Sequence, residues 1–228
     1  MSIQIGRWRF SAHQLLIAIV LWILVTPFII PLKNGELVSS LLLTLLLFSA
    51  VLVVGGSSRK LLTAVILVAP AFVGKWVDNF WPGAISDPVI LAVALLFIAY
   101  VVVNLFGFIF TVQRVNQAVL LVAISIYLMM GILWAFAYLF VSRLLPDAFA
   151  FNTMPSSERL MNDFNAIYFS FVTLSTVGYG DIIPTGKSSR LLAISEASAG
   201  MIYLAVVVAR LVALYSLEGK QKTPEDHP

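Results

Sequence analysis

The stretch that decides the fold is Tyr168-Phe-Ser-Phe-Val-Thr-Leu-Ser-Thr-Val-Gly-Tyr-Gly-Asp181. It belongs to a charge-free run, Phe164 to Gly180, that is long enough to lie at membrane depth but ends in two glycines and is flanked by Asp163 and Asp181. Irregular backbone is tolerated at that depth only where it is buried in protein or lines a water-filled cavity. The stretch therefore predicts the lining of a pore rather than a simple membrane span.

The composition around this stretch indicates a membrane protein. Of the 228 residues, 61% are hydrophobic and 11% are charged, and the mean hydropathy is +1.00. Soluble domains carry about 25% charged residues, so a water-soluble fold is excluded. The net charge of +3 includes no basic block, and we therefore expect no nucleic-acid partner. Cysteine is absent, which excludes disulfides and thiolate metal sites.

The apolar residues predict six membrane-spanning helices, since a helix needs about 20 such residues to cross the hydrocarbon layer. The third stretch reaches that length only if Lys75 extends to the lipid surface. The first, which follows Arg7 and Arg9, also resembles a secretory signal, but without a small-residue cleavage site we expect a retained helix. The six stretches are Phe10–Leu32, Leu37–Ser58, Leu61–Trp81, Pro88–Gln113, Val115–Ser142 and Leu191–Tyr215.

The basic residues of the first four helices predict the orientation. Cytoplasmic segments are enriched in lysine and arginine, and the first helices usually dominate insertion. A cytoplasmic N-terminus places more of these residues inside than outside, and six crossings return the C-terminus to the same side. We therefore expect a multi-pass protein of the plasma (inner) membrane with both termini in the cytoplasm. The inside set is Arg7, Arg9, Arg59, Lys60 and Arg114, and the outside set is Lys33 and Lys75.

Asp163 to Ser175 reads as a short re-entrant helix that enters from outside and stops halfway. Asn162 and Asp163 suit its N-terminal cap and the positive end of its dipole. Its C-terminal carbonyls would direct partial negative charge toward a cation below it.

The pattern Thr-x-x-Thr-x-Gly-Tyr-Gly-Asp, from Thr173 to Asp181, resembles the potassium-channel signature without a departure. The resemblance implies a selectivity filter that binds K⁺ through backbone carbonyls and the Thr176 hydroxyl. Because successive carbonyls must face one axis, we expect positive φ at Gly178 and Gly180. Tyr179 would hold the width of the filter by packing behind it. The implied K⁺ site comprises Thr176, Val177, Gly178, Tyr179 and Gly180.

The resemblance further implies the architecture of bacterial six-transmembrane, one-pore potassium channels of the voltage-gated-like superfamily. The expected fold is an all-α membrane protein with a pore helix and filter between helices five and six. One chain supplies one filter strand, so the channel is expected to be a homotetramer. The expected regions are a four-helix domain at residues 1–114, a pore domain at 115–217 and a short cytoplasmic tail at 218–228.

Several residues near the predicted filter are candidates for supporting or gating roles. Thr173, Asp181 and Glu196 are candidates for filter support, and Asp181 could instead form an acidic ring at the outer mouth. Gly200 is either a gating hinge, as in related channels, or a site of close helix packing. Arg210 is expected near the inner mouth, or extended to lipid phosphate.

The fourth predicted helix argues against voltage sensing. Pro88 to Gln113 contains no arginine, and Arg114 stands alone at its end. Each charge that crosses the field is worth about 2.3 kcal/mol per 100 mV, and steep gating needs three or four per subunit. We expect a voltage-independent conductance. Only 13 residues follow Tyr215, so gating is expected from the membrane part, the filter or an unidentified regulatory subunit.

Two other functions remain open on the sequence. A potassium uptake transporter subunit also uses a filter-like loop, but usually carries four of them in a longer chain. A non-conducting structural helix bundle is the second alternative. No catalytic residues are expected, because the two histidines lie near opposite ends of the chain. The expected binding partners are further copies of the chain, membrane lipids and the permeant K⁺, with no cofactor.

Overall fold

The computed structural model describes residues 2–29, 35–54, 58–80, 86–113, 115–152 and 159–221. Lys33, Trp81, Arg114 and the tail from residue 222 onward lie outside these ranges. For Arg7, Arg9 and Lys75 the structure describes the backbone and not the side chain.

Within the described residues, each of the six apolar stretches contains a helix. Four of these helices are long and apolar enough to cross a membrane, namely α1, α4, α5 and α7. The apolar part of α2, Leu37–Val53, is shorter, and crossing by α2 and α3 stays a prediction. The elements are α1 (Ser2–Ile29), α2 (Gly35–Val54), α3 (Ser58–Phe80), α4 (Asp87–Thr111), α5 (Gln117–Leu144), the 3₁₀ turn η1 (Pro146–Ala148), β1 (Phe149–Phe151), α6 (Asp163–Leu174), β2 (Ile182–Pro184) and α7 (Lys187–Gln221).

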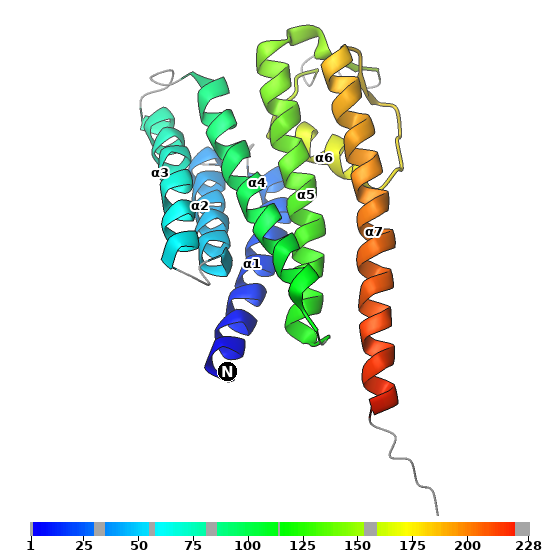
Figure 1. Ribbon diagram of the computed structural model, residues 1–228. Helices are drawn as coiled ribbons and strands as arrows, with labels where there is room; N and C mark the ends of the chain where they lie inside the picture. Colours follow the sequence, from blue (N-terminus) through cyan, green and yellow to red (C-terminus); the bar gives the residue numbers. More distant parts are fainter. Residues whose placement is uncertain are drawn as a thin grey trace, which may run out of the picture.

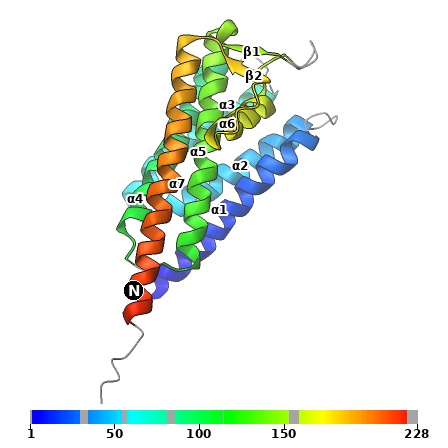
Figure 2. The ribbon, with the colours of Figure 1, turned by 90° about the vertical axis from the view of Figure 1, so that its right-hand side faces the viewer.

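The central element of the fold is α5, which contacts α1, α4, α6 and α7. Its buried face includes Ile126, Met129, Ile132 and Ala135, which are close to fully enclosed. Figures 1 and 2 show the short α6 beside α5 and α7 in the half of the molecule that holds β1 and β2. The N-terminus and the end of α7 both lie at the opposite end of the molecule, apart from each other (Figure 1). An arrangement with both ends on one side agrees with an even number of crossings.

A small antiparallel sheet departs from the all-α prediction. Phe149 pairs with Pro184 and Phe151 with Ile182, and the backbone N–H of Thr185 donates to the Ala148 carbonyl at 2.9 Å. Strands of three residues are too short to give a recognisable alternation of polar and apolar side chains, which is why the sequence did not predict them. The sheet fixes the segment after the filter to the end of α5.

Candidate functional site

The site begins with α6, whose limits agree with the short helix expected between Asp163 and Ser175. The side chain of Asn162 accepts a hydrogen bond from the backbone N–H of Asn165 at 2.8 Å, which confirms the predicted N-cap. At the other end, the N–H of Ser175 donates to the carbonyl of Phe171 at 3.0 Å. The helix therefore ends at Leu174, two residues before Thr176, and leads directly into the predicted filter stretch.

The backbone of the predicted filter stretch, Thr176 to Gly180, alternates in handedness. Gly178 and Gly180 have φ of 58° and 79°, which confirms the positive values expected for them. Thr176 also has a positive φ of 60°, which the sequence did not reveal because threonine lacks the conformational freedom of glycine. Every second residue from Thr176 to Gly180 is therefore left-handed. An extended strand normally turns alternate carbonyls to opposite sides, and alternating handedness turns successive carbonyls toward one side.

In the predicted filter stretch the backbone N–H groups of residues 176 to 178 are hydrogen-bonded to α6, whereas most of the backbone carbonyls have no hydrogen-bond donor among the described residues. The N–H groups of Val177 and Gly178 both donate to the carbonyl of Val172, at 2.9 and 3.4 Å, and that of Thr176 donates to Thr173 at 2.9 Å. Within the described part of the chain, no group donates to the carbonyls of residues 176 to 179. Four consecutive carbonyl oxygens, on residues that the single chain leaves exposed, are thus without a protein partner.

The outer end of the filter is tied to α6 and to the end of β1. The Tyr168 hydroxyl donates to Asp181 Oδ2 at 2.6 Å, and this hydrogen bond raises the pKa of the phenol to about 12. The rings of Tyr168 and Tyr179 stack nearly parallel, with centroids 6.5 Å apart. The side-chain amide of Asn152 donates to the Gly180 carbonyl at 3.0 Å. The Asp181 carboxylate is therefore engaged from behind by Tyr168, which is the geometry of the bracing alternative.

Gly200 lies against the C-terminal end of α6. A methyl group built on its backbone would stand 2.4 Å from the Leu174 carbonyl oxygen and 3.0 Å from Leu174 Cδ1. Real Cβ atoms do not approach backbone oxygen so closely, and only glycine fits between α7 and the last residue of the pore helix. The close-packing alternative therefore has a direct geometric basis, while a hinge at this residue stays a prediction.

Glu196 is fully buried one turn before Gly200 on α7. Its two carboxyl oxygens contact the hydroxyls of Tyr138 on α5 and Ser170 on α6. Neither partner was predictable from the sequence, because a tyrosine in an apolar helix and a serine in the short helix α6 are both common without such a contact.

Arg210 reaches from α7 to the C-terminal end of α4. Its Nη2 donates to the carbonyls of Phe110 at 2.7 Å and Val112 at 3.1 Å, and the guanidinium lies 5.7 Å from the Phe110 ring centroid. A cation at a helix C-terminus satisfies the last carbonyls and opposes the negative end of the dipole. These contacts bind one terminal nitrogen of the guanidinium to protein. Its place at an inner mouth and its extension to lipid phosphate both stay predictions.

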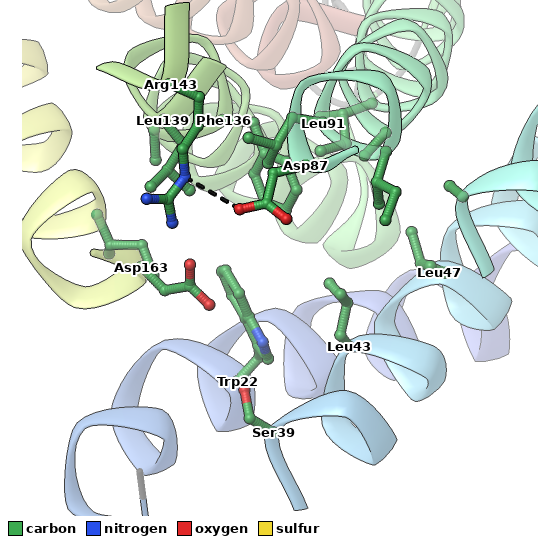
Figure 3. Close-up of a pocket in the computed structure, with 16 residues that line it drawn as sticks. Trp22, Ser39, Leu43, Leu47, Asp87, Leu91, Phe136, Leu139, Arg143 and Asp163 are labelled. Atoms are coloured by element: carbon green, nitrogen blue, oxygen red, sulfur yellow. Dashed lines mark ion pairs between the residues drawn. The ribbon is translucent and has the colours of Figure 1, made fainter. Parts of the chain in front are cut away.

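A cavity of about 210 Å³ lies between the N-terminal helices and the pore helix (Figure 3). Arg143 of α5 and Asp87 of α4 form an ion pair across it, with 3.4 Å between Nε and Oδ2. Asp163 of α6 and Trp22 of α1 face each other beneath that pair. None of the predicted filter residues lines this space. It marks where the first four helices meet the pore helix.

Comparison with known proteins gives one family match. The sequence model of a family described as an ion channel matches residues 90–216, which run from α4 to the end of the spanning part of α7. The chain is 45% identical over 49 residues to two-pore potassium channel 4 of Arabidopsis thaliana, covering 22% of this chain and 17% of that one. It is 49% identical over 51 residues to voltage-gated potassium channel Kch of Escherichia coli, covering 22% and 12%.

A longer match is to inward rectifier potassium channel Kirbac3.1 of Paramagnetospirillum magnetotacticum. It is 33% identical over 92 residues, which cover 40% of this chain and 28% of that one. The chain thus spans less than a third of the length of each of these curated relatives. No solved structure matches it.

Proposed function

The chain belongs to the ion-channel family, and from this premise we propose that it is the pore-forming subunit of a potassium-selective channel. Three potassium channels are among the proteins it resembles, although each match covers only part of them. The proposed activity is passive conduction of K⁺ through the stretch from Thr176 to Gly180. Val177, Gly178 and Tyr179 would supply the intermediate carbonyls.

The observation that carries this proposal is the row of carbonyls at residues 176 to 179 that have no donor among the described residues. Carbonyl oxygens replace the hydration shell of a K⁺ ion that enters a filter. The positive φ values at Thr176, Gly178 and Gly180 support an arrangement in which these oxygens face one side. The bonds from Val177 and Gly178 to Val172 hold the other side of the strand against the pore helix. One chain would therefore coordinate a cation with carbonyl oxygens from one side only.

A single wall cannot surround an ion, and we therefore include a homotetramer in the proposal. The uncovered apolar surface of α7 supports it, since 17% of its spanning window is buried in one chain against 61% for α5. Ile194, Met201 and Ile202 are each more than half exposed. Tyr179 is 71% exposed. In a fourfold assembly these surfaces would face the axis or a neighbouring copy.

The proposed conductance does not depend on voltage. Helix α4 holds one charged residue, Asp87, in its first turn. A sensor needs several charges that move through the membrane field, and α4 offers none in its interior. The name of the Escherichia coli relative includes voltage gating, but the match covers 12% of that protein. We place both termini in the cytoplasm, with the filter opening outward.

The test is a potassium flux assay on the full chain in liposomes. We expect K⁺ flux that barium blocks and that Na⁺ alone does not replace. Gly178→Ala should abolish it, because φ is 58° and no atom lies within 4 Å of the added methyl, so only backbone conformation changes. Gly107→Ala is the matched control, as its methyl also meets nothing within 4 Å. Absence of flux from tetrameric protein would refute the channel, and equal Na⁺ flux would refute the selectivity.

A further inference from the structure

One buried carboxyl group joins the three helices that surround the filter. Glu196 of α7 is 0% exposed. Its Oε2 contacts the Tyr138 hydroxyl of α5, and its Oε1 contacts the Ser170 hydroxyl of α6. No basic residue in the described part of the chain forms an ion pair with it. The group therefore depends on hydroxyl partners alone.

The number of hydrogens available determines the charge of this carboxyl. Ser170 Oγ also lies 2.7 Å from the carbonyl oxygen of Gly131. A carbonyl only accepts, so the single hydroxyl hydrogen of Ser170 points to Gly131. The contact between Ser170 and Glu196 then needs a hydrogen from the carboxyl. A neutral Glu196 supplies it and accepts from Tyr138, which gives three hydrogens for three contacts. An ionised Glu196 leaves one pair of oxygens in contact with no hydrogen between them.

The surroundings of Glu196 favour the same state. The titratable groups that face it are Tyr138 and the more distant Tyr127, both on α5. On α6 its polar neighbour is Ser170, which carries no charge. Both tyrosines are neutral, so no cation compensates a negative charge there. An isolated carboxylate away from water is costly, and such groups take up a proton instead.

Glu196 holds the half of α6 that leads into the filter. Ser170 lies one turn before Leu174, and Leu174 packs on Gly200, which lies one turn after Glu196. Two contacts one turn apart on α7 thus fix two points one turn apart on α6. Thr176 follows Leu174 by two residues, so a shift of α6 moves the start of the filter.

We propose that Glu196 is a positioning residue that holds the pore helix in register with α5 and α7 only while it carries a proton. The inference rests on the proposed channel function. Loss of the proton at alkaline pH breaks the Ser170 contact and leaves a buried charge. The pore helix then loses one of its two anchors on α7, and conduction falls.

The deciding variant is Glu196→Gln. A glutamine keeps the shape of the side chain and provides one donor for Ser170 and one acceptor for Tyr138, as the neutral acid does. In liposomes we expect wild-type K⁺ flux to fall about tenfold for each pH unit beyond the midpoint of proton loss. The glutamine variant should keep the neutral-pH flux and show no such fall. A parallel fall in both proteins, or loss of neutral-pH flux in a folded glutamine variant, would overturn the proposal.

Two measurements separate this inference from the channel function. Infrared spectra at neutral pH should show the carbonyl stretch of a protonated carboxylic acid that is missing in Glu196→Gln, whether or not the protein conducts. The melting temperature of the wild type should fall as pH rises from the ordinary carboxyl range to the midpoint of proton loss in the folded state and then level off, because across that range only the folded state keeps the proton; Glu196→Gln should show no such fall. Absence of the infrared difference would overturn the inference. If the infrared spectra differ as expected but neither the wild type nor any variant conducts K⁺, the channel function is refuted and the inference about the Glu196 proton stands.

A serine pair supplies the matched control. Ser170→Ala removes the oxygen that accepts the hydrogen bond from the Glu196 carboxyl, and it should lower the melting temperature at neutral pH. Ser125 of α5 is equally buried, but its hydroxyl donates to the Leu121 carbonyl of its own helix at 2.8 Å. Ser125→Ala should therefore have the smaller effect. Equal effects of the two substitutions would argue against a special contact at Ser170.

Discussion

Gly200→Ala tests how tightly the inner helix supports the filter. The added methyl would stand 2.4 Å from the carbonyl oxygen of Leu174, while ordinary contacts begin near 3.4 Å. The two helices would have to separate by about 1 Å. The obstructing atom belongs to the backbone, so no side-chain rotation relieves the clash. Because Leu174 ends α6, the displacement reaches Ser175 and Thr176 directly.

The cost of this methyl follows from two opposing effects. Overpacking a close contact typically costs about 1–3 kcal/mol. Replacing glycine by alanine inside a helix returns about 1 kcal/mol through backbone entropy. Since rigid backbone opposes the methyl, we expect the upper part of the first range and a net loss of about 1–2 kcal/mol. The loss should appear as a lower melting temperature together with a reduced preference for K⁺ over Na⁺.

The assay compares three alanine substitutions by thermal unfolding and by reversal potentials in mixed K⁺ and Na⁺. At Gly107 the methyl meets nothing within 4 Å, and at Gly131 it meets the Phe171 ring at 2.6 Å, a side chain that can rotate. The expected order of damage is Gly200 above Gly131 above Gly107. Unchanged stability and selectivity in Gly200→Ala would refute the packing argument. A change in open times alone would favour the hinge.

Three further predictions concern the contacts around the filter and the inner helix. Tyr168→Phe removes the 2.6 Å hydrogen bond to Asp181 and should lower the stability of the filter by about 1 kcal/mol. The preference for K⁺ over Na⁺ should fall with it, which a shift of the reversal potential would show; an unchanged potential would contradict bracing. Arg210→Ala removes both hydrogen bonds to the end of α4 and should lower the melting temperature. Arg210→Lys should be intermediate, because an ammonium group lacks the planar set of donors of a guanidinium. Equal melting temperatures of the wild type and both variants would contradict a stabilising contact between α7 and α4. Replacing K⁺ by choline should lower the melting temperature of the wild type, since a bound ion stabilises the folded form by mass action, and Gly178→Ala should lose this dependence.

The parts of the fold that were predictable are those that local sequence determines. Asn162 caps α6 because its side chain bonds to a backbone group three residues away, and this preference is readable in the sequence. The positive φ of Gly178 and Gly180 was predictable because a lining of carbonyls requires it and glycine permits it. Both features depend on residues within a few positions of each other.

The features that escaped prediction depend on contacts between distant segments. Glu196 contacts Tyr138, 58 positions earlier, and Arg210 reaches Phe110 across 100 positions. Neither partner has a residue type or spacing that singles it out. Thr176 adopts a left-handed conformation that its own preferences oppose. The bonds from Thr176, Val177 and Gly178 back to the pore helix support it, and they exist only once α6 is in place.

The sheet of β1 and β2 has a consequence for assembly. By pairing Phe149 with Pro184 it closes a loop that contains the whole of α6 and the filter stretch. Much of the ordering entropy of that loop is then lost inside a single chain, before any neighbour arrives. Association of four copies would therefore join filter strands that are already shaped. Preorganised partners lose less freedom when they bind, so strengthening or weakening this outer sheet should change how readily subunits assemble, even though none of its residues belongs to the proposed K⁺ site.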